Sequence, residues 1–302
     1  MSAALVFSVI VPTRDRLATL QRCIDALVAQ DFPHERFEII VIDDGGRQSP
    51  APLLETYTSH NLILLTQKNA GPAAARNAGA ERARGAFLAF TDDDCWPAPG
   101  WLSALEHKLV TTPDQMIGGL TRNRVERNAY SEVSQALVSY LYEYYNDGDD
   151  VRFLTSNNMA VPAPLFRMIG GFSARFPRAA AEDRDFCERW THAGLAMRYA
   201  ADAVVEHHHV LDLHGFWRQH FNYGRGAHGF HLARASRGRG PLRIEPPRFY
   251  LGLVGYPLAR ERSARALYRA ALMALTQIAN AAGFFYEAVT MRLTTSRPRN
   301  PA

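Results

Sequence analysis

The sequence has 302 residues, of which 47% are hydrophobic and 21% charged, as is ordinary for a folded protein with a sizeable core. The net charge of +4 is too small for a dedicated nucleic-acid binder, so we expect no nucleic-acid partner. The three cysteines are an odd number without a CxxC pair, which argues against a disulfide framework or a zinc site and fits a reducing, cytoplasmic compartment.

Unbroken apolar runs alternate with helical patterns through the first third of the chain. We expect strands at residues 6–11, 38–42, 62–65 and 86–90, with helices at residues 17–30 and 71–83. No basic segment precedes the first run, so we interpret it as a buried strand and not as a signal peptide. Unbroken apolar strands with helices between them predict an α/β fold with a parallel sheet covered on both faces.

Two acidic clusters directly follow predicted strands. Asp43-Asp44 ends the second strand, and Asp92–Asp94 ends the fourth. Open α/β sheets bind ligands at the carboxyl ends of their strands. Three adjacent carboxylates suit Mg²⁺ or Mn²⁺, although a solvated acidic turn has the same composition. The Asp44 carboxylate is suited to accept a hydrogen bond from the base or the ribose of a nucleotide. The alternative interpretation is an Asp-Gly turn without a binding role.

A glycine turn comes before the predicted helix at residues 71–83. The N-terminus of this helix and Arg76 suit a phosphate group, and a capped helix with a solvated arginine is the alternative. The sequence contains neither a GxGxxG motif nor a P-loop motif.

The middle of the chain supplies further polar groups. We expect helices at residues 102–110 and 131–145, a polar turn at 146–150, and an acidic helix that begins near Glu182. The pair Glu182-Asp183 is either a response to the helix dipole or a source of a general base. Of the three histidines at residues 207–209, at most two face one site, because strand residues alternate between faces.

The remaining residues, 211–302, are rich in arginine and in helical pattern. We expect a long helix at residues 264–291, whose uncharged stretch at 270–286 is short for a membrane span and indicates a buried or interfacial helix. The basic residues before that stretch predict peripheral contact with the inner face of a membrane; they are Arg260, Arg262, Arg265 and Arg269. A tail folded onto the catalytic domain, or a homodimer, is the alternative.

Five segments together resemble the family 2 glycosyltransferases, which have the GT-A fold. They are SVIVPTRDR, EIIVIDDGG, NAGPAAARNAGAERARGAFLAFTDDDCWPAPGWL, SNNMAVPAPLFRMIGGF and EDRDFCERW. The resemblance covers about residues 7–209, and it implies a Rossmann-like, mostly parallel sheet with flanking helices. We therefore expect a GT-A catalytic domain at residues 1–210 and a helical, Arg-rich C-terminal extension at 211–302. The nucleotide-binding half would be about 1–100, and the acceptor half about 101–210.

The resemblance also implies a donor site for a nucleotide-sugar, with UDP expected. Asp44 would contact the base, with Pro12 and Arg14 beside it. Asp92 and Asp93 would face the ribose and the metal shell. One departure is DDGGRQ where the family usually has DDGS, which leaves the local turn contacts open but not the acid.

The roles implied for the reaction fall on four more residues. Asp94 would bind a Mn²⁺ or Mg²⁺ ion that bridges the diphosphate, with Asp92 close by and His207 as a late ligand. Asp183 would be the catalytic base, with Glu182 beside it. The reaction would invert the anomeric configuration on transfer to a hydroxyl of a glycan, a lipid-linked acceptor or a small molecule.

Three other functions are weighed against this one. An NAD-dependent oxidoreductase requires glycines after the first strand, and the loop PTRDRLAT has none. A nucleotidyltransferase of similar fold requires a Gly-rich loop at the same place. A binding module for nucleotide-sugars or membrane surfaces would keep Asp44 and the basic tail but would not need Asp183.

Overall fold

The computed structural model describes residues 4–58, 60–176, 180–238 and 244–295. The chain divides into two compact units. The first, which we name the sheet unit, comprises Met1–Glu126, Leu141–Pro177 and Asp183–His209. The second, the helical unit, comprises Arg127–Tyr140, Arg178–Glu182 and Val210–Ala302. Residues 296–302 of the predicted extension lie outside the described residues.

An eight-stranded sheet organises the sheet unit, in the order β3-β2-β1-β4-β9-β6-β10-β5. Its strands are β1 (Phe7–Thr13), β2 (Phe37–Asp44), β3 (Leu62–Gln67), β4 (Phe87–Thr91), β5 (Cys95–Pro97), β6 (Met116–Asn123), β9 (Asn158–Pro162) and β10 (Met197–His207). The pairs β1–β2, β1–β4, β2–β3 and β6–β10 are parallel. Strand β9 is antiparallel to β4 and β6, and β5 is antiparallel to β10. The prediction of a mostly parallel sheet is therefore confirmed.

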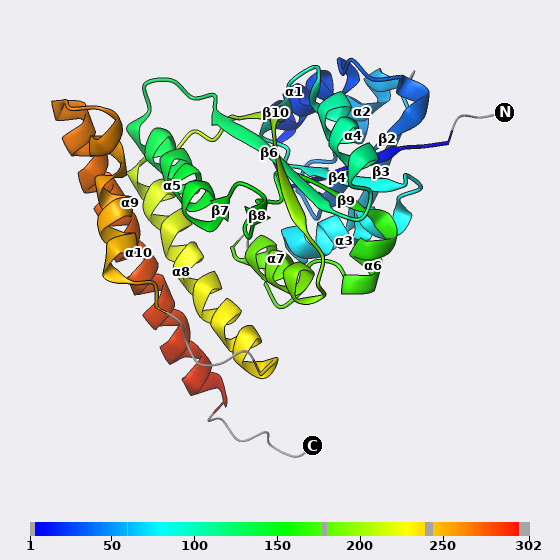
Figure 1. Cartoon of the computed structure of the whole chain (residues 1–302). Helices are drawn as coiled ribbons and strands as arrows, with labels where there is room; N and C mark the ends of the chain where they lie inside the picture. The colour runs from blue at the N-terminus through cyan, green and yellow to red at the C-terminus, as the bar shows by residue number, and fades with distance from the viewer. Residues whose placement is uncertain (1–3, 59, 177–179, 239–243, 296–302) are drawn as a thin grey trace. The chain divides into compact units, whose positions relative to one another are not determined.

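Helices cover both faces of this sheet (Figure 1). The helices of the sheet unit are α1 (Leu17–Val28), α2 (Ala51–Leu54), α3 (Pro72–Arg82), α4 (Trp101–Thr111), α6 (Ala163–Ile169) and α7 (Glu182–His192). Short 3₁₀ turns occur at His34–Arg36 and Glu55–Tyr57, and β7 (Asn146–Asp147) pairs with β8 (Asp150–Val151) in a small hairpin. In Figure 1, α1 and α4 lie on one side of the sheet, and α3, α6 and α7 lie on the other.

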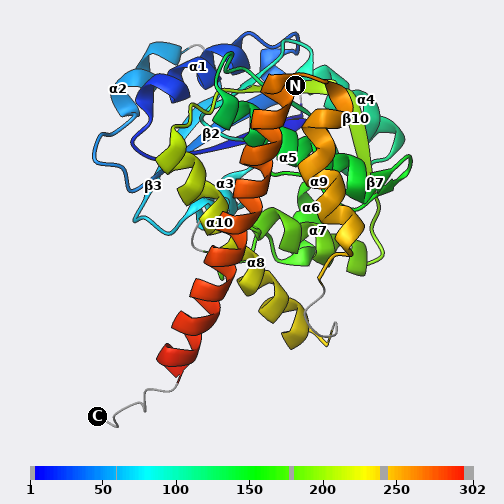
Figure 2. The ribbon, with the colours of Figure 1, turned by 90° about the vertical axis from the view of Figure 1, so that its left-hand side faces the viewer.

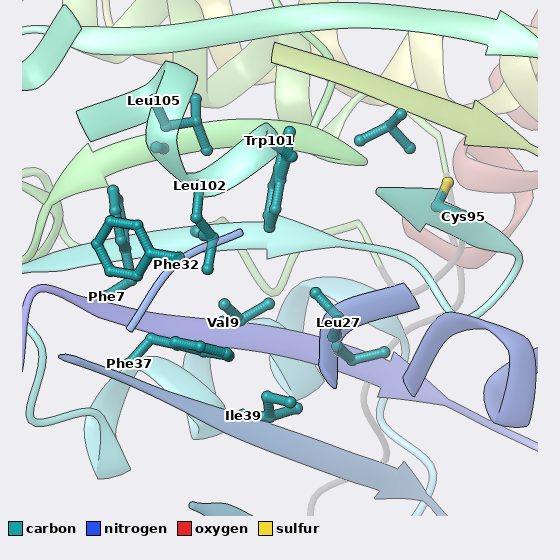
Figure 3. Packing of buried hydrophobic residues seen from close by; sticks show 14 of the residues in the cluster. Phe7, Val9, Leu27, Phe32, Phe37, Ile39, Cys95, Trp101, Leu102 and Leu105 are labelled. Atoms are coloured by element: carbon teal, nitrogen blue, oxygen red, sulfur yellow. The ribbon is translucent and has the colours of Figure 1, made fainter. Parts of the chain in front are cut away.

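The alternation of side chains along β1 explains the two layers. Val9 and Val11 point into a cluster with α1 and α4, which Figure 3 shows from close by. Ile10, between them, belongs to a second cluster with the alanines of α3 and with Phe186 of α7. Because successive strand residues face opposite sides, an unbroken apolar run is what a strand buried on both faces requires.

Long helices build the helical unit. They are the first part of α5 (Ala129–Tyr145), α8 (Leu213–Ser236), α9 (Pro247–Arg260) and α10 (Ala264–Thr295). Asp212 caps the N-terminus of α8, because its carboxylate accepts a hydrogen bond from the Gly215 N–H at 2.7 Å. Within the described residues, no helix combines the length and the apolar character that a membrane span needs.

Two glycines allow α8 and α10 to approach each other closely. A Cβ atom on Gly224 would lie 1.8 Å from the backbone oxygen of Asn280, and one on Gly283 would lie 1.9 Å from that of Phe221. Backbone-to-backbone contact of the kind between α8 and α10 accepts only glycine. Helix α9 lies alongside the N-terminal half of α10, as both views show (Figures 1 and 2).

Candidate functional site

The carboxyl ends of the parallel strands meet at one edge of the sheet. Thr13 ends β1, Asp44 ends β2, and Thr91 ends β4 directly before Asp92. Strand β10 runs in the same direction as β4, because β9 is antiparallel to both β4 and β6 while β6 is parallel to β10. His207, the last residue of β10, therefore reaches the same edge, which is where sheets of this type bind ligands.

A turn after β4 buries two of the three aspartates. Asp93 and Asp94 are 4% and 6% exposed. The Cys95 N–H donates to the backbone oxygen of Asp92 at 3.0 Å and closes the turn. The hydroxyl of Thr13 donates to Asp93 Oδ2 at 2.7 Å. Buried carboxylates need such partners, so this turn is built around its charges.

Arg16, in the loop after β1, contacts both buried carboxylates. Its Nη1 donates to Asp93 Oδ1 at 3.0 Å and to Asp94 Oδ2 at 2.6 Å. The Arg16 side chain is 52% exposed, so the guanidinium reaches the carboxylates from the solvent side. Arg16 was not among the residues singled out from the sequence.

A group of possible metal ligands lies beside this contact. Among the described residues, ligand atoms of Asp94, Cys95 and His207 lie within 4.8 Å of one another. The antiparallel pairing of β10 with β5 sets His207 opposite Cys95, and His207 Nε2 lies 3.4 Å from Asp94 Oδ1. Burial raises the pKa of the Cys95 thiol well above its ordinary value, which leaves it protonated and a poor ligand. Carboxylate oxygen and imidazole nitrogen suit Mn²⁺ and related cations, so Asp94 and His207 are the pair that fits a divalent metal.

Burial and neighbouring charges move the pKa values in this group apart. Burial raises the pKa of Asp93 to about 7 against the opposing charge of Arg16, and the Asp94 charge adds to the rise. Burial also acts on Asp94, but His207 and Arg16 outweigh it and hold the pKa of Asp94 below its usual value. Burial would lower the pKa of His207, and contact with Asp94 raises it instead. Of the two buried aspartates in this turn, Asp94 is thus the one that is kept ionised.

Asp44 anchors the loop that leads into α3. Its carboxylate accepts hydrogen bonds from Gln67 Nε2 at 2.7 Å, from the Ala70 N–H at 2.8 Å and from the Gly71 N–H at 2.9 Å. Gly71 has a φ of 89°, a conformation that glycine adopts without strain, and α3 starts at the next residue. A carboxylate has about four acceptor positions, so roughly one of those of Asp44 is left for a ligand.

Arg76 joins α3 to the acidic turn. It is 3% exposed, and its Nη2 donates to Asp92 Oδ1 at 2.6 Å. Pro12 lies within β1 and is half-buried, whereas Arg14 is exposed in the loop after it. Of the predicted donor residues, Arg76, Asp92 and Asp93 thus lie on or beside one turn.

Asp183 lies in the first turn of α7. The Arg184 N–H donates to Asp183 Oδ1 at 2.8 Å. Burial raises the pKa of Asp183, although that hydrogen bond and the charge of Arg76 oppose the rise. Glu182, the first residue of α7, is buried. Asp185 is fully buried and binds Arg189 Nε at 2.8 Å, which gives it a structural role.

His208 has surroundings unlike those of His207. Its ring stacks on Trp96, with centroids 4.9 Å apart and planes at 13°. Its backbone N–H donates to the backbone oxygen of Asp94 at 2.8 Å. The two adjacent histidines therefore make different contacts: His207 ends β10 beside Asp94, and His208 follows it against Trp96.

The family model described as glycosyl transferase family 2 matches residues 8–170. This match covers β1 to β4, the acidic turn and β9. The chain belongs to glycosyl transferase family 2.

Named relatives of this family 2 glycosyltransferase are 26% and 27% identical to it over the aligned residues. Glycosyltransferase AglE of Haloferax volcanii is 26% identical over 236 residues, which cover 75% of this chain and 74% of AglE. The pre-mycofactocin glycosyltransferase of Mycobacterium tuberculosis is 27% identical over 227 residues, which cover 73% of this chain but 46% of the relative. The chain thus spans about half the length of the second relative.

Solved structures show that the fold is GT-A. The mannosyltransferase PcManGT of Pyrobaculum calidifontis, solved in complex with GDP-Man and Mn²⁺, matches with a TM-score of 0.60 and 18% identity over 98% of this chain and 82% of that chain. A fragment of TarS from Staphylococcus aureus, solved in complex with UDP-GlcNAc, matches with a TM-score of 0.57 and 16% identity over 96% of this chain and 92% of that chain. The GT-A fold expected from the sequence motifs is thereby confirmed.

The geometry adds three residues of this glycosyltransferase to those found from the sequence. Thr13 is the last residue of β1, and Arg16 lies in the loop after it, which was noted in the sequence for its lack of glycine. Cys95 lies next to the acidic run, and only the β5–β10 pairing reveals that it faces His207. Thr13 could have been found from the sequence, because it comes at the end of a predicted strand. No sequence pattern indicated the contacts of Arg16.

Proposed function

We propose that this chain is an inverting glycosyltransferase that moves a sugar from a nucleoside diphosphate sugar to an acceptor hydroxyl. The observation that carries the proposal is the position of Asp94 and His207. Asp94, in the turn after β4, and His207, at the end of β10, are far apart in sequence, yet their ligand atoms lie within 4.8 Å of each other at the ligand-binding edge of a GT-A sheet.

On the donor side, Asp94 and His207 would hold Mn²⁺ or Mg²⁺, and Asp92 would orient the donor together with Arg76. Bound there, a divalent cation supplies charge stabilisation for the departing diphosphate. Arg76, held by Asp92 at 2.6 Å, adds a fixed positive charge near the same edge. Asp44 would receive a base N–H at its remaining acceptor position, with Pro12 and Arg14 lining that side.

On the acceptor side, Asp183 would act as the general base. The acceptor oxygen forms the new bond to the anomeric carbon while the bond from that carbon to the diphosphate oxygen breaks. Asp183 takes the acceptor proton, and attack from the face opposite the leaving group inverts the configuration. Its raised pKa makes the Asp183 carboxylate a stronger base than an ordinary aspartate.

The nucleotide and the acceptor are proposed by class. The solved structures of PcManGT and TarS hold GDP-Man and UDP-GlcNAc respectively. Both are nucleoside diphosphate sugars, so UDP stays the expected nucleotide and GDP belongs in the same test. A glycan, a lipid-linked acceptor or a small molecule would supply the hydroxyl.

A pair of conservative substitutions tests the base and separates turnover from mere binding. Asp183→Asn keeps the shape and removes the basicity, so kcat should fall by roughly 10²–10⁴ with donor affinity nearly unchanged. Glu182→Gln should retain most of the kcat. If only Glu182→Gln loses activity, the base is Glu182. If wild type binds donor but releases no nucleotide with any acceptor hydroxyl supplied, the chain is a binding module and the transfer proposal is wrong.

Alanine substitutions of two adjacent histidines test the metal site by Mn²⁺ affinity, without an activity assay. His207→Ala should weaken Mn²⁺ binding, measured by electron paramagnetic resonance titration, by about tenfold to a hundredfold. His208→Ala, whose ring stacks on Trp96, should leave Mn²⁺ affinity within about twofold. Equal losses in both variants would contradict the assignment of His207.

A further inference from the structure

Helix α10 carries a continuous apolar face that points to solvent. The exposed residues recur at steps of three, four and seven, which places them on one side of a helix. We name this face the outer stripe; it comprises Leu267, Ala271, Ile278, Ala281, Phe285 and Val289. At 1.5 Å per residue it extends for about 33 Å. Leu267, Ile278 and Phe285 are 63%, 59% and 67% exposed, unusually high for large apolar side chains in a series.

The opposite face of α10 is already packed. Ala266, Met273 and Ala279 are buried, and Gly283 lies against the backbone of α8. The outer stripe is therefore a second apolar side, which the packing of the described helices leaves uncovered.

Exposed arginines stand at both ends of the outer stripe. Arg262 precedes its N-terminal end and Arg292 lies at its C-terminal end, both exposed, and residues 270–286 between them carry no charge. Arg265 is also exposed, but it lies on the packed side of α10, four residues before Arg269. Arg269 does not belong to this set. It is half-buried and binds Glu132 at 2.5 Å and Glu261 at 3.1 Å.

We propose that the outer stripe lies flat on an anionic lipid surface, with the flanking arginines at the headgroups. An apolar face about 33 Å long, without charge along its middle and with arginines at its ends, is the pattern of an interfacial helix. Phe285 places an aromatic ring near one end of the stripe, where such helices meet the headgroup boundary. This inference is independent of the proposed transfer chemistry.

The charges favour lipid over a second copy of the helix. In a parallel pair of outer stripes, Arg292 would lie beside its own counterpart. In an antiparallel pair centred on the stripe, Arg292 would approach the end of the second copy that carries Arg262. Either arrangement brings like charges together, whereas anionic headgroups complement both ends of the stripe.

Vesicle flotation of the full chain tests the proposal. The chain should float with vesicles of phosphatidylglycerol mixed with phosphatidylcholine at low salt, and binding should fall at high salt. The double substitution Ile278→Asp with Phe285→Asp should lower the partition coefficient by about tenfold or more. Arg262→Gln with Arg292→Gln should lower it by about 25-fold, since each arginine contributes about fivefold.

A control substitution on the sheet unit distinguishes the stripe from surface apolarity in general. Val110 of α4 is 73% exposed, and Val110→Asp should leave flotation unchanged. Circular dichroism melting confirms that each variant is folded. The proposal is overturned if wild type does not float with anionic vesicles at low salt, or if the Ile278→Asp, Phe285→Asp variant floats as well as wild type. It is also overturned if light scattering shows that wild type is a dimer and this variant a monomer, because a second copy would then cover the stripe.

Discussion

Asp183 combines the role proposed for it with an environment that disfavours its charge. Burial raises its pKa, and a general base works only when it is deprotonated. We therefore expect kcat to fall on acidification through an apparent pKa above the ordinary aspartate value of about 3.9. A pH profile of kcat at saturating donor measures this. An acidic limb at the ordinary aspartate value, or one unchanged in Asp183→Asn, would contradict it.

The same raised pKa affects stability, with a definite sign. Between the unfolded and folded pKa values, the folded state binds more protons at Asp183 than the unfolded state. The free energy of unfolding therefore falls as pH rises through that window. Asp183→Asn removes this loss, so its Tm should equal or exceed that of wild type at neutral pH, and the difference should vanish in acid. A lower Tm of the variant at neutral pH, with no recovery in acid, would speak against the assigned shift.

Arg16 holds the carboxylates that the proposed metal would need. Its guanidinium contacts Asp93 and Asp94, so a cation that binds Asp94 competes with it. We expect Arg16→Gln to tighten Mn²⁺ binding by about fivefold to tenfold, because removal of a nearby positive charge leaves the site more negative. Arg14→Gln, exposed two residues earlier, is the matched control. Weaker Mn²⁺ binding in Arg16→Gln would mean that Arg16 positions the carboxylates for the metal.

Among the elements, the contact between α8 and α10 has the least tolerance. Gly283→Ala places a Cβ 1.9 Å from the backbone oxygen of Phe221, a clash that side-chain rotation does not relieve. We expect it to lower the free energy of unfolding by about 1–3 kcal/mol. Gly255→Ala in α9 has nothing within 4 Å of the new Cβ and should stabilise by about 0.5–1 kcal/mol. Urea unfolding compares the two, and equal effects would show that the close contact is absent.

The elements that the sequence predicted are those whose pattern is unambiguous. Strands β1 to β4 are unbroken apolar runs, and α1, α3, α4, α5, α7 and α10 follow helical spacing, so their positions agree with the structure within a few residues. Strand β6 contains Gly118-Gly119, and β9 starts with a buried asparagine, so neither has an apolar strand pattern. Helix α8 mixes four histidines and four glycines with aromatics, which hides its periodicity.

The site was predictable to the extent that it follows from strand ends. Asp44 and Asp92 to Asp94 come directly after apolar runs, and their meeting at one edge follows from parallel pairing. The contact between Asp94 and His207 depends on β10 pairing with β6 and β5, which no local pattern reveals. Arg16 depends on the path of an exposed loop, so its contacts become visible only in the folded chain.

At the scale of the whole molecule, the chain joins a GT-A sheet unit to a helical unit with an exposed apolar face. The proposed chemistry depends on the first and the proposed lipid contact on the second. Loss of vesicle binding on changing the outer stripe should therefore leave Mn²⁺ affinity unchanged. Titration of Mn²⁺ into the Ile278→Asp, Phe285→Asp variant measures this, and a large change in affinity would contradict the independence of the two functions.

The central claim is metal-dependent binding of a nucleoside diphosphate sugar at Asp94. Saturation-transfer NMR with a panel of UDP-, GDP- and dTDP-sugars in Mg²⁺ tests it most directly, because it requires no knowledge of the acceptor. We expect transfer signals from at least one donor in wild type, and their loss both with EDTA and in Asp94→Asn. Signals that persist unchanged with EDTA and in Asp94→Asn, or no signal from any donor, would contradict the account.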